Sequence, residues 1–487
     1  MESGTLDELR IFFFPFMAQG HIIPTIDMAM VFASRGSKAT IITTPFHAPL
    51  FSKTIQKTNF SGTHINILTF KFPSVENGLP EGCESLHMAN SPELQPKFFK
   101  AITTLGPQLD QLLEQHRPDC LVADTFFPWA TDIAARYEIP RLIFHGTCYF
   151  SLCASLCVFR YKPYKSVFSE TEPFIIPNLP GEIKFTRNQL PDFVKNDEET
   201  EFTEVYKAAK EVESRSYGVL VNSFYELEPV YADHYSKGLG FKAWHIGPLF
   251  LYKKVFEEKA KREMEESSLD EHECLKWLSS KKRNSVVYIC FGSLTDFIDA
   301  QLMEIAAGLE ASGKEFIWVV KKGKNEGVKE EWLPEGYEKR MEGKGLIVRG
   351  WAPQVQILDH EAVGGFVTHC GWNSTMEGIC AGVPVVAWPV SAEQFYNEKL
   401  VTQILGIGVC VGNQKWARLV GDFVKRETIA KAVNQIMEGE EAEKMRSKVK
   451  ALGDMARRAI EEGGSSYLDF NAFIEELKLR RMERNSS

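Results

Sequence analysis

The chain has 487 residues, which is too long for one ordinary domain, so we expect two or three domains. Its formal net charge is −9, because 65 Asp and Glu residues outnumber 56 Lys and Arg residues. This balance argues against nucleic acid or an anionic membrane as a partner, and any nucleotide must be bound by local hydrogen-bond donors.

The chain opens with MESGTLDELR, which has acidic side chains and no long apolar core, so we expect no secretory signal peptide. Residues 11–14 form the first predicted strand and residues 17–20 a loop. Residues 21–34 follow as a helix, with Pro24 in its first turn, where proline is tolerated. Further strands are expected at residues 39–43, 65–70, 120–123, 141–145, 219–222 and 244–246, and helices at residues 94–116 and 126–137.

Two stretches of the first half are predicted to be long loops. Residues 73–92 are rich in Gly, Pro, Glu and Asn, whereas residues 168–202 have little periodicity and several prolines and are expected to include one short helix. The most apolar later run, near residues 150–159, is too short to span a bilayer. Strands that alternate with helices predict parallel βαβ units.

Residues 249–269 are charged and poor in large apolar side chains, which is typical of a linker. The second half begins with a helix near residues 271–278 and a strand at 286–290, which enters the loop Phe291-Gly292-Ser293. A helix at 300–311 and strands at 316–320 and 346–349 follow, and later helices are expected at 394–405, 427–437 and 466–481. We therefore predict an N-terminal domain at 1–248, a C-terminal domain at 270–465 and a terminal helix with a tail at 466–487.

The predicted strand at 346–349 is followed by a stretch that spans residues 351–394 and reads WAPQVQILDHEAVGGFVTHCGWNSTMEGICAGVPVVAWPVSAEQ. A buried strand at 366–368 leads through His369-Cys370-Gly371 into a helix at 372–381, and a second strand follows at 385–388. A glycine turn before a helix N-terminus is a ready phosphate site, because free backbone N–H groups and the helix dipole favour an anion. His369 would lie at the carboxyl end of its strand, where open α/β sheets bind ligands.

The same stretch closely resembles the donor-binding box of plant secondary-product UDP-glycosyltransferases of glycosyltransferase family 1. The flanks FPFMAQGHIIPTIDMA and WPVSAEQFYNEKLV resemble the branch that glucosylates phenolics and terpenoids. The resemblance implies an α/β protein with two facing doubly wound Rossmann-like domains, the GT-B arrangement, and a cleft between them. It also implies that the N-terminal domain binds the acceptor, the C-terminal domain binds the UDP-sugar, and the terminal helix packs back on the N-terminal domain.

His21 is the best candidate for a general base, because the pKa of an ordinary histidine suits this work near neutral pH. From spacing alone, a histidine near a helix N-terminus is more often a cap or a surface residue, but the resemblance places the family's base in this loop. Asp124 ends a predicted strand and could cap the next helix. By resemblance it is instead the carboxylate that orients His21, and both roles can hold at once.

Most donor-binding residues are predicted by resemblance. Ser374 and Glu377 have the spacing of a capping box, but in the family the glutamate holds the ribose hydroxyls and the serine a phosphate. Trp351 would stack on uracil or be a core residue, with the backbone of Ala352 and the side chain of Gln354 at the edge of the base or the ribose. His369 would donate to the pyrophosphate, and Gly20, Ser293 and Asn373 complete this part of the site.

The end of the box is predicted to bind the sugar. Glu393 and Gln394 would normally be solvated on a first helical turn, but in the family they bond to the sugar hydroxyls. Gln394 and Trp372 both favour glucose, whereas Glu393 replaces the family's usual aspartate. The acceptor pocket is predicted to include Phe16, Met17, Phe126, Phe127 and Thr147.

No cofactor is expected beside UDP-glucose as co-substrate. The sequence has no D-x-D and no His/Cys cluster with ligand spacing, so no metal site is expected. No G-x-G-x-x-G follows the strands near Phe14 or Cys290, which argues against a nicotinamide cofactor. The ten cysteines form no CxxC pair and are predicted to be free thiols in a reducing cytosol.

The predicted function is an inverting, metal-independent O-glucosyltransferase that uses UDP-glucose and acts on a small apolar plant metabolite such as a flavonoid, another phenolic or a triterpenoid. The protein is expected to be a cytoplasmic monomer without integral membrane association. Two alternatives stay open. One is a UDP-sugar epimerase of the same fold, and the other is a nucleotide-sugar-binding protein without catalysis.

Overall fold

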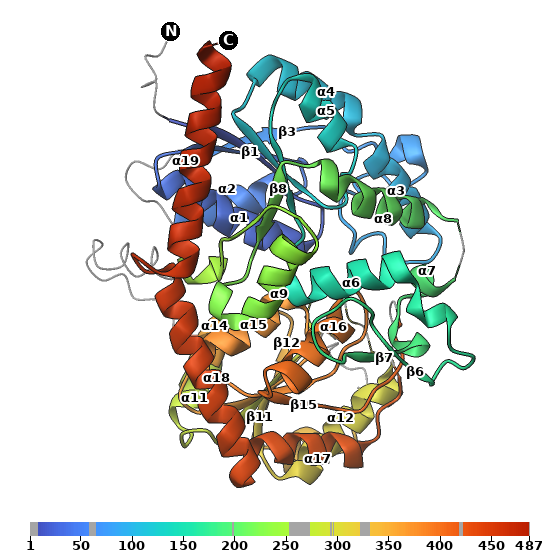
Figure 1. The fold of residues 1–487 in the computed structure, drawn as a ribbon. Coiled ribbons are helices and arrows are strands. Elements are labelled where there is room, and N and C mark those ends of the chain that lie inside the picture. The colour runs from blue at the N-terminus through green and yellow to red at the C-terminus, as the bar shows by residue number, and fades with distance from the viewer. Residues whose placement is uncertain are drawn as a thin grey trace. The chain divides into compact units, whose positions relative to one another are not determined.

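The computed structural model describes residues 8–57, 65–196, 199–252, 273–292, 295, 297–321, 332–417 and 422–486. The chain forms two compact units, each built from more than one stretch of sequence (Figure 1). Unit 1 comprises Met1–Tyr149, Asn196–Ser267 and Arg458–Ser487, and unit 2 comprises Phe150–Lys195 and Ser268–Arg457.

Unit 1 contains a parallel sheet in the order β3-β2-β1-β4-β5-β8-β9. Its strands are β1 Arg10–Phe14, β2 Lys38–Thr43, β3 Ile65–Thr69, β4 Cys120–Asp124, β5 Arg141–Phe144, β8 Gly218–Val221 and β9 Ala243–His245. Its helices are α1 Gln19–Ser34, α2 Ala48–Lys57, α3 Leu94–Thr103, α4 Gly106–His116, α5 Ala130–Arg136, α8 Glu201–Val212, α9 Pro229–Asp233 and α19 Ser465–Ser486. Short 3₁₀ or π segments are η1 Val75–Asn77, η4 Glu213–Arg215, η5 Tyr225–Leu227 and η6 His234–Gly238.

Unit 2 contains a second parallel sheet in the order β12-β11-β10-β13-β14-β15. Its strands are β10 Val286–Cys290, β11 Glu315–Val320, β12 Gly345–Arg349, β13 Val363–Thr368, β14 Val385–Ala387 and β15 Gly408–Cys410, with a separate hairpin of β6 Pro173–Ile175 and β7 Lys184–Thr186. Its main helices are α6 Tyr149–Tyr161, α11 Glu273–Ser279, α12 Asp299–Ser312, α15 Trp372–Ala381, α16 Gln394–Lys399, α17 Arg426–Met437 and α18 Gly439–Ile460. Shorter segments are α7 Asp192–Lys195, α13 Tyr337–Arg340, α14 Gln354–Leu358, η2 Pro163–Lys165, η3 Arg187–Gln189 and η7 Leu400–Ile404.

Each sheet separates two apolar cores, because successive side chains of a strand point to opposite faces. In β1, Phe13 packs with Phe32 of α1 and Phe470 of α19, whereas Phe12 and Phe14 belong to the core on the other face. In unit 2, Val287 and Ile289 of β10 lie in one core and Val286 and Tyr288 in the other. Burial on both faces explains why these strands are continuous apolar runs.

Apart from β9, which extends the sheet of unit 1, the two sheets share one strand order, in which the first strand lies inside the sheet and pairs with the fourth. The strand order reverses between β1 and β4 in unit 1 and between β10 and β13 in unit 2. Open α/β sheets bind ligands at the carboxyl ends of the strands at this switch point. The predicted α/β class of two doubly wound units is therefore confirmed.

Several predicted elements were wrong in detail. The predicted helix at 94–116 is two helices, α3 and α4, because Gly106-Pro107 starts a new helix where proline has no N–H to donate. The predicted helix at 126–137 begins only at Ala130, after a turn that contains Pro128. The predicted loop at 168–202 contains the short helix expected there, α7, but also the β6–β7 hairpin, which was not predicted.

The compact units also differ from the contiguous domains expected from sequence. Residues 150–195 pack with unit 2 although they precede the predicted boundary at 248, whereas α19, which the resemblance placed on the N-terminal domain, packs with unit 1. Most of the predicted linker, residues 253–269, lies outside the described residues. Compactness does not test independent folding, so the domain boundaries stay a prediction.

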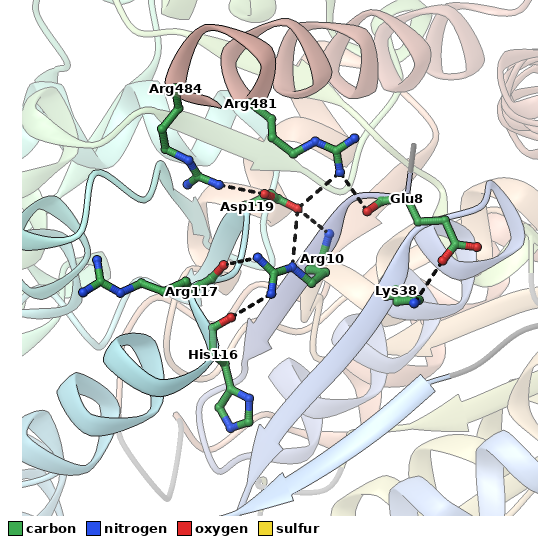
Figure 2. Close-up of polar contacts among 8 residues, drawn as sticks. All are labelled: Glu8, Arg10, Lys38, His116, Arg117, Asp119, Arg481 and Arg484. Carbon is green, nitrogen blue, oxygen red and sulfur yellow. Dashed lines mark hydrogen bonds and ion pairs between the residues drawn. The ribbon is translucent and has the colours of Figure 1, made fainter. Parts of the chain in front are cut away.

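A buried carboxylate joins α19 to the strands of unit 1 (Figure 2). The side chain of Asp119 is 3% exposed, and its Oδ2 accepts from the backbone N–H of Arg10 at 2.8 Å. Arg484 of α19 donates to Oδ1 at 2.9 Å, and Arg481 lies 3.7 Å from Oδ2 and donates to the Glu8 carbonyl. The chain's first strand and its last helix are therefore tied to one residue just before β4.

None of the helices in the described part of the chain combines the length and apolar character needed to cross a bilayer.

Candidate active site

The predicted base and its carboxylate are in contact within unit 1. His21 lies in the first turn of α1, directly after β1, and Asp124 ends the neighbouring strand β4. Nδ1 of His21 lies 2.7 Å from Oδ2 of Asp124. The carboxylate is completely buried, whereas 23% of the histidine side chain is exposed. The switch point of this sheet therefore carries a buried carboxylate behind a partly exposed imidazole.

This contact sets the tautomer of His21. A carboxylate can only accept, so Nδ1 carries the proton and Nε2 presents a lone pair. Two aromatic rings pack against the imidazole. The ring centroids of Phe16 and Phe126 lie 5.3 Å and 5.7 Å from the centroid of the His21 ring. A histidine with this tautomer and a carboxylate behind it is suited to accept a proton at Nε2.

The simpler capping roles do not describe these residues. Ala18 precedes α1 without a side-chain cap, and Trp129 precedes α5 in the same way. The second oxygen of Asp124 accepts from the backbone N–H of Phe126 at 3.0 Å, within the turn before α5. Gly20 lies in the first turn of α1, where a Cβ would meet no atom within 4 Å.

Arg141 supports the dyad and was missed by the sequence analysis. It is 2% exposed, and its guanidinium donates to the carbonyls of Asp124 at 2.9 Å and of Ala123 and Phe127 at 3.4 Å each. Burial lowers the pKa of Arg141 to about 9, while the charges of Asp124 and Glu213 act in the opposite direction. The sequence signal for this buried role was the position of Arg141 at the start of an apolar strand.

The predicted acceptor residues do not share one environment. Phe16, Met17 and Phe127 are almost fully buried, and Phe127 stacks on Phe14 with ring centroids 4.0 Å apart. Phe126 is only partly buried against this core. The Thr147 hydroxyl is buried and has no hydrogen-bond partner among the described residues. Phe126 and Thr147 are therefore better placed than Phe127 to meet a ligand.

In unit 2, the predicted phosphate site lies at the switch point of the second sheet. Cys370 has a φ of 62° and Gly371 leads into α15, so the turn presents the first N–H groups of that helix. Glycines make room for the His369 ring, because a Cβ on Gly292 or Gly371 would lie 2.7 or 2.6 Å from it. Burial, and then the charge of Lys321, lower the pKa of His369 to about 4, so the ring is neutral at pH 7.

Gln354, Ser374 and Glu377 are brought together at the first turns of α15. Nε2 of Gln354 donates to Oε2 of Glu377 at 2.6 Å and to Oγ of Ser374 at 3.1 Å, and Tyr288 donates to Oε1 of Gln354 at 3.2 Å. The capping-box alternative is excluded, because Gly371 is the residue before the helix and Ser374 lies inside it. Ser374 and Glu377 therefore do not cap the helix but are joined through Gln354 in its first turns.

The remaining predicted donor residues differ in exposure. Trp351 is 77% exposed, which excludes a core role and leaves a large aromatic face in solvent. Ala352 is buried, Asn373 is partly buried in the first turn of α15, and Trp372 is 2% exposed. Trp372 therefore shapes the site through packing and its backbone N–H. Ser293 lies outside the described residues.

Glu393 and Gln394 are not simply solvated. Oε1 of Glu393 accepts from the N–H of Trp372 at 3.3 Å, and Oε1 of Gln394 accepts from the N–H groups of Val390 and Ser391, each at 2.9 Å. The sequence analysis also missed Asn397, a buried residue of α16 that donates to Glu393 at 3.2 Å. Among the residues that the structure describes, no group of three or more His, Cys, Asp or Glu side chains could hold a metal ion.

Residues 263–440 match the sequence family described as UDP-glucoronosyl and UDP-glucosyl transferase. UDP-glucose flavonoid 3-O-glucosyltransferase 7 of Fragaria ananassa is 57% identical to this chain, and the match covers 98% of each of the two chains. Scopoletin glucosyltransferase of Nicotiana tabacum is 56% identical over 97% of this chain and 98% of its own length. The solved structure of Glycyrrhiza uralensis UGT73P12 with glycyrrhetinic acid 3-O-monoglucuronide has a TM-score of 0.89 and 40% identity, and the match covers 98% of this chain and 97% of that chain.

Proposed function

The chain belongs to the UDP-glycosyltransferase family, and we propose that it transfers glucose from UDP-glucose to a hydroxyl group of a small apolar plant metabolite. The observation that carries this proposal is the 2.7 Å contact between His21 and Asp124, at the switch point of the sheet in unit 1. A protein that only bound a nucleotide sugar would not need this dyad. The names of the relatives are those of transferases and not of epimerases.

In the proposed reaction, Nε2 of His21 accepts the proton of the acceptor hydroxyl while the hydroxyl oxygen forms a bond to the anomeric carbon of glucose. The bond from that carbon to the β-phosphate oxygen breaks, and its electron pair leaves with UDP. Attack opposite to the leaving group inverts the configuration at this carbon. Asp124 stabilises the imidazolium that forms, as the carboxylate of a catalytic triad does.

The donor is expected to bind along the first turns of α15. The N–H groups of Asn373 and Ser374, with His369 beside them, would neutralise the pyrophosphate in place of a metal ion. Trp351 would stack on uracil, and Gln354 and Glu377 would meet the ribose. Glu393 and Gln394 would bind the hydroxyls of the sugar.

The acceptor is expected to be a phenolic compound of the flavonoid or hydroxycoumarin class, because two relatives carry the names of enzymes for such compounds. A triterpenoid is the second candidate, since UGT73P12 was solved with glycyrrhetinic acid 3-O-monoglucuronide. We further expect a cytoplasmic monomer. The ten free cysteines support the cytoplasmic location.

The test is to incubate the purified protein with UDP-glucose and, in turn, a flavonol, a hydroxycoumarin and a triterpenoid. Mass spectrometry should detect an acceptor that has gained one hexose, together with an equal amount of UDP. A parallel incubation without acceptor tests the epimerase alternative, which requires conversion of UDP-glucose to another UDP-hexose. UDP-glucose binding with neither product would leave only a binding protein.

A further inference from the structure

Asn397 is completely buried on α16, and its side chain forms hydrogen bonds inside unit 2. Its Nδ2 donates to the carbonyl of Cys370 at 2.8 Å and to Oε1 of Glu393 at 3.2 Å. Its Oδ1 accepts from the hydroxyl of Ser151 on α6 at 2.7 Å. The Ser151 hydroxyl can donate and the other two partners can only accept, so the orientation of the amide is determined.

Both acceptors of the Asn397 amide belong to the predicted donor site. Cys370 lies between His369 and the first residues of α15, and its φ of 62° is a conformation that costs a non-glycine residue free energy. Such a conformation persists only where neighbouring groups hold it. The bond from Asn397 to the Cys370 carbonyl is one such restraint.

The second bond closes a ring of contacts around the start of α15. Oε1 of Glu393 accepts from Asn397 and also from the N–H of Trp372, the first residue of that helix. The carboxylate is therefore held against the helix N-terminus in one orientation. A rotation of the Asn397 side chain would release the turn and Glu393 together.

We propose that Asn397 is a positioning residue for the donor sugar, which fixes the orientation of Glu393 and the conformation of the His369–Gly371 turn. This inference rests on the proposed function, in which Glu393 binds a sugar hydroxyl and the turn binds the pyrophosphate. Ser151 acts through Asn397, since its hydroxyl keeps the two N–H groups of the amide aimed at their acceptors.

The binding of the glucose ring distinguishes a positioning role of Asn397 from a purely structural one. UDP lacks the glucose ring, so it does not depend on the orientation of Glu393. UDP keeps only the contacts with the turn, so loss of Asn397 should weaken the binding of UDP-glucose, which uses both the turn and Glu393, more than the binding of UDP. A residue that only stabilised the fold would affect both ligands alike or neither of them.

The experiment measures the dissociation constants of UDP-glucose and UDP by calorimetry for wild-type protein and for Asn397→Ala and Asn397→Asp. Asp keeps the size of the side chain but cannot donate to Cys370 or Glu393. Each variant should bind UDP-glucose about tenfold more weakly, which is the value of one buried hydrogen bond, and UDP less than threefold more weakly.

Gln301→Ala is the matched control. Gln301 is a buried amide of α12 in the same unit, and it bonds to the backbone of Val424 rather than to the donor site. This variant should lose thermal stability without changing the ratio of the two affinities. If the Asn397 variants lose stability and keep the wild-type ratio, as Gln301→Ala does, the proposal is overturned.

Ser151→Ala and Ser151→Thr provide a second test if the Asn397 variants do not fold. Ser151→Ala removes the donor to Oδ1 of Asn397 and should weaken the binding of UDP-glucose by a smaller factor than the Asn397 variants do. Ser151→Thr retains a hydroxyl and should bind UDP-glucose more tightly than Ser151→Ala. Equal UDP-glucose affinity in Ser151→Ala and wild type would contradict the proposal. Failure of the wild-type protein to bind UDP-glucose would instead contradict the proposed function.

Discussion

In the proposed mechanism, His21 acts as the base with the help of its neighbours on the sheet. Asp124 favours the proton on Nδ1 and stabilises the charge that develops when Nε2 accepts a second proton. Arg141 in turn holds the carbonyls of the segment that carries Asp124, so the carboxylate has little freedom to move away.

His21→Ala should lower kcat by about 10²–10⁴-fold, because general base catalysis contributes on this scale. The affinity for UDP should be nearly unchanged, since His21 is predicted to contact the acceptor and not the nucleotide. Turnover is best measured with an alcohol acceptor, because an acidic phenol can ionise without the base. Wild-type turnover of an alcohol by this variant would remove His21 from the mechanism.

Some site residues could be predicted from the sequence and others could not. Resemblance and spacing identified Gln354, Ser374 and Glu377, which the structure brings into hydrogen-bond contact. Spacing alone could not choose between a capping box and a ligand site, since only the start of α15 at Trp372 decides this. Asn397 was not predicted because its partner Ser151 is 246 residues away in the chain.

At the scale of elements, α15 is the proposed site of the pyrophosphate, and its first turn offers much of what this group would require. Its N–H groups carry partial positive charge, and the turn before it carries a neutral His369 that can donate a hydrogen bond. Stabilisation of this kind needs no cation. It acts mainly on the transition state, because charge grows on the leaving phosphate.

The wild-type enzyme should therefore keep its activity in EDTA. His369→Ala should weaken UDP binding and lower kcat, and added Mg²⁺ should not restore the variant, because no ion is expected to act at the phosphate. Activity would be followed as UDP release with and without chelator. Complete loss in EDTA that Mg²⁺ or Mn²⁺ reverses would contradict this account and require metal ligands.

Two histidines that closely follow strands should make the fold sensitive to mild acid. Burial lowers the pKa of His47, after β2, and of His369, after β13, to about 4 each. An unfolded histidine has a pKa near 6.5, so between about pH 6.5 and 4 the unfolded chain binds more protons than the folded one. Stability is fully present above this window and is lost as the pH falls through it.

From pH 7 to pH 5, each of these histidines should lower the free energy of unfolding by about 2 kcal/mol. The pKa of Glu213 is about 2, because its interactions with His145, Lys210 and Tyr235 outweigh its burial, so this carboxylate contributes only below about pH 4.5. Urea denaturation at pH 7 and pH 5 measures the decrease in the free energy of unfolding. In His47→Asn this decrease should be smaller by about half of what the two histidines contribute together. An unchanged loss in this variant would exclude His47 as a source.

Buried strands were predicted well, whereas several amphipathic helices and the β6–β7 hairpin were not. The strands of both sheets that carry the dyad and the turn were found as apolar runs. The sequence analysis named no helix for α18, whose 22 residues bury only small or widely spaced apolar side chains such as Ala442, Val449 and Ala456. The β6–β7 hairpin lies among prolines and glycines, which are typical of loops.

At the scale of the whole molecule, the parts that were hardest to predict are those in which distant stretches of chain share one unit. Residues 150–195 pack with unit 2, which was not predicted, and α19, which only the resemblance placed on the N-terminal domain, packs on the face of unit 1 formed by α1 and β9. Periodicity reports which face of an element is apolar but not which partner covers it. Asp119 gives the α19 contact a specific register, because Arg481 and Arg484 lie on successive positions of one helical face.

Asp119→Asn should lower the free energy of unfolding of the protein by about 2–3 kcal/mol, because the buried carboxylate accepts from Arg484 and from the backbone of Arg10 while Arg481 adds charge. The amide retains the shape of the side chain, so the change reports the lost charge and acceptor rather than a cavity.

The matched control is Asp132→Asn, whose partner Arg215 is also an arginine but whose ion pair is exposed, with side chains 61% and 58% exposed. Exposed pairs contribute about 0–1 kcal/mol, so this variant should unfold almost as wild type does. Urea denaturation compares the two variants, and hydrogen exchange should be faster in α19 for Asp119→Asn only. Equal stability of the two variants would mean that α19 is held by the packing of Phe470 and Phe473 and not by Asp119.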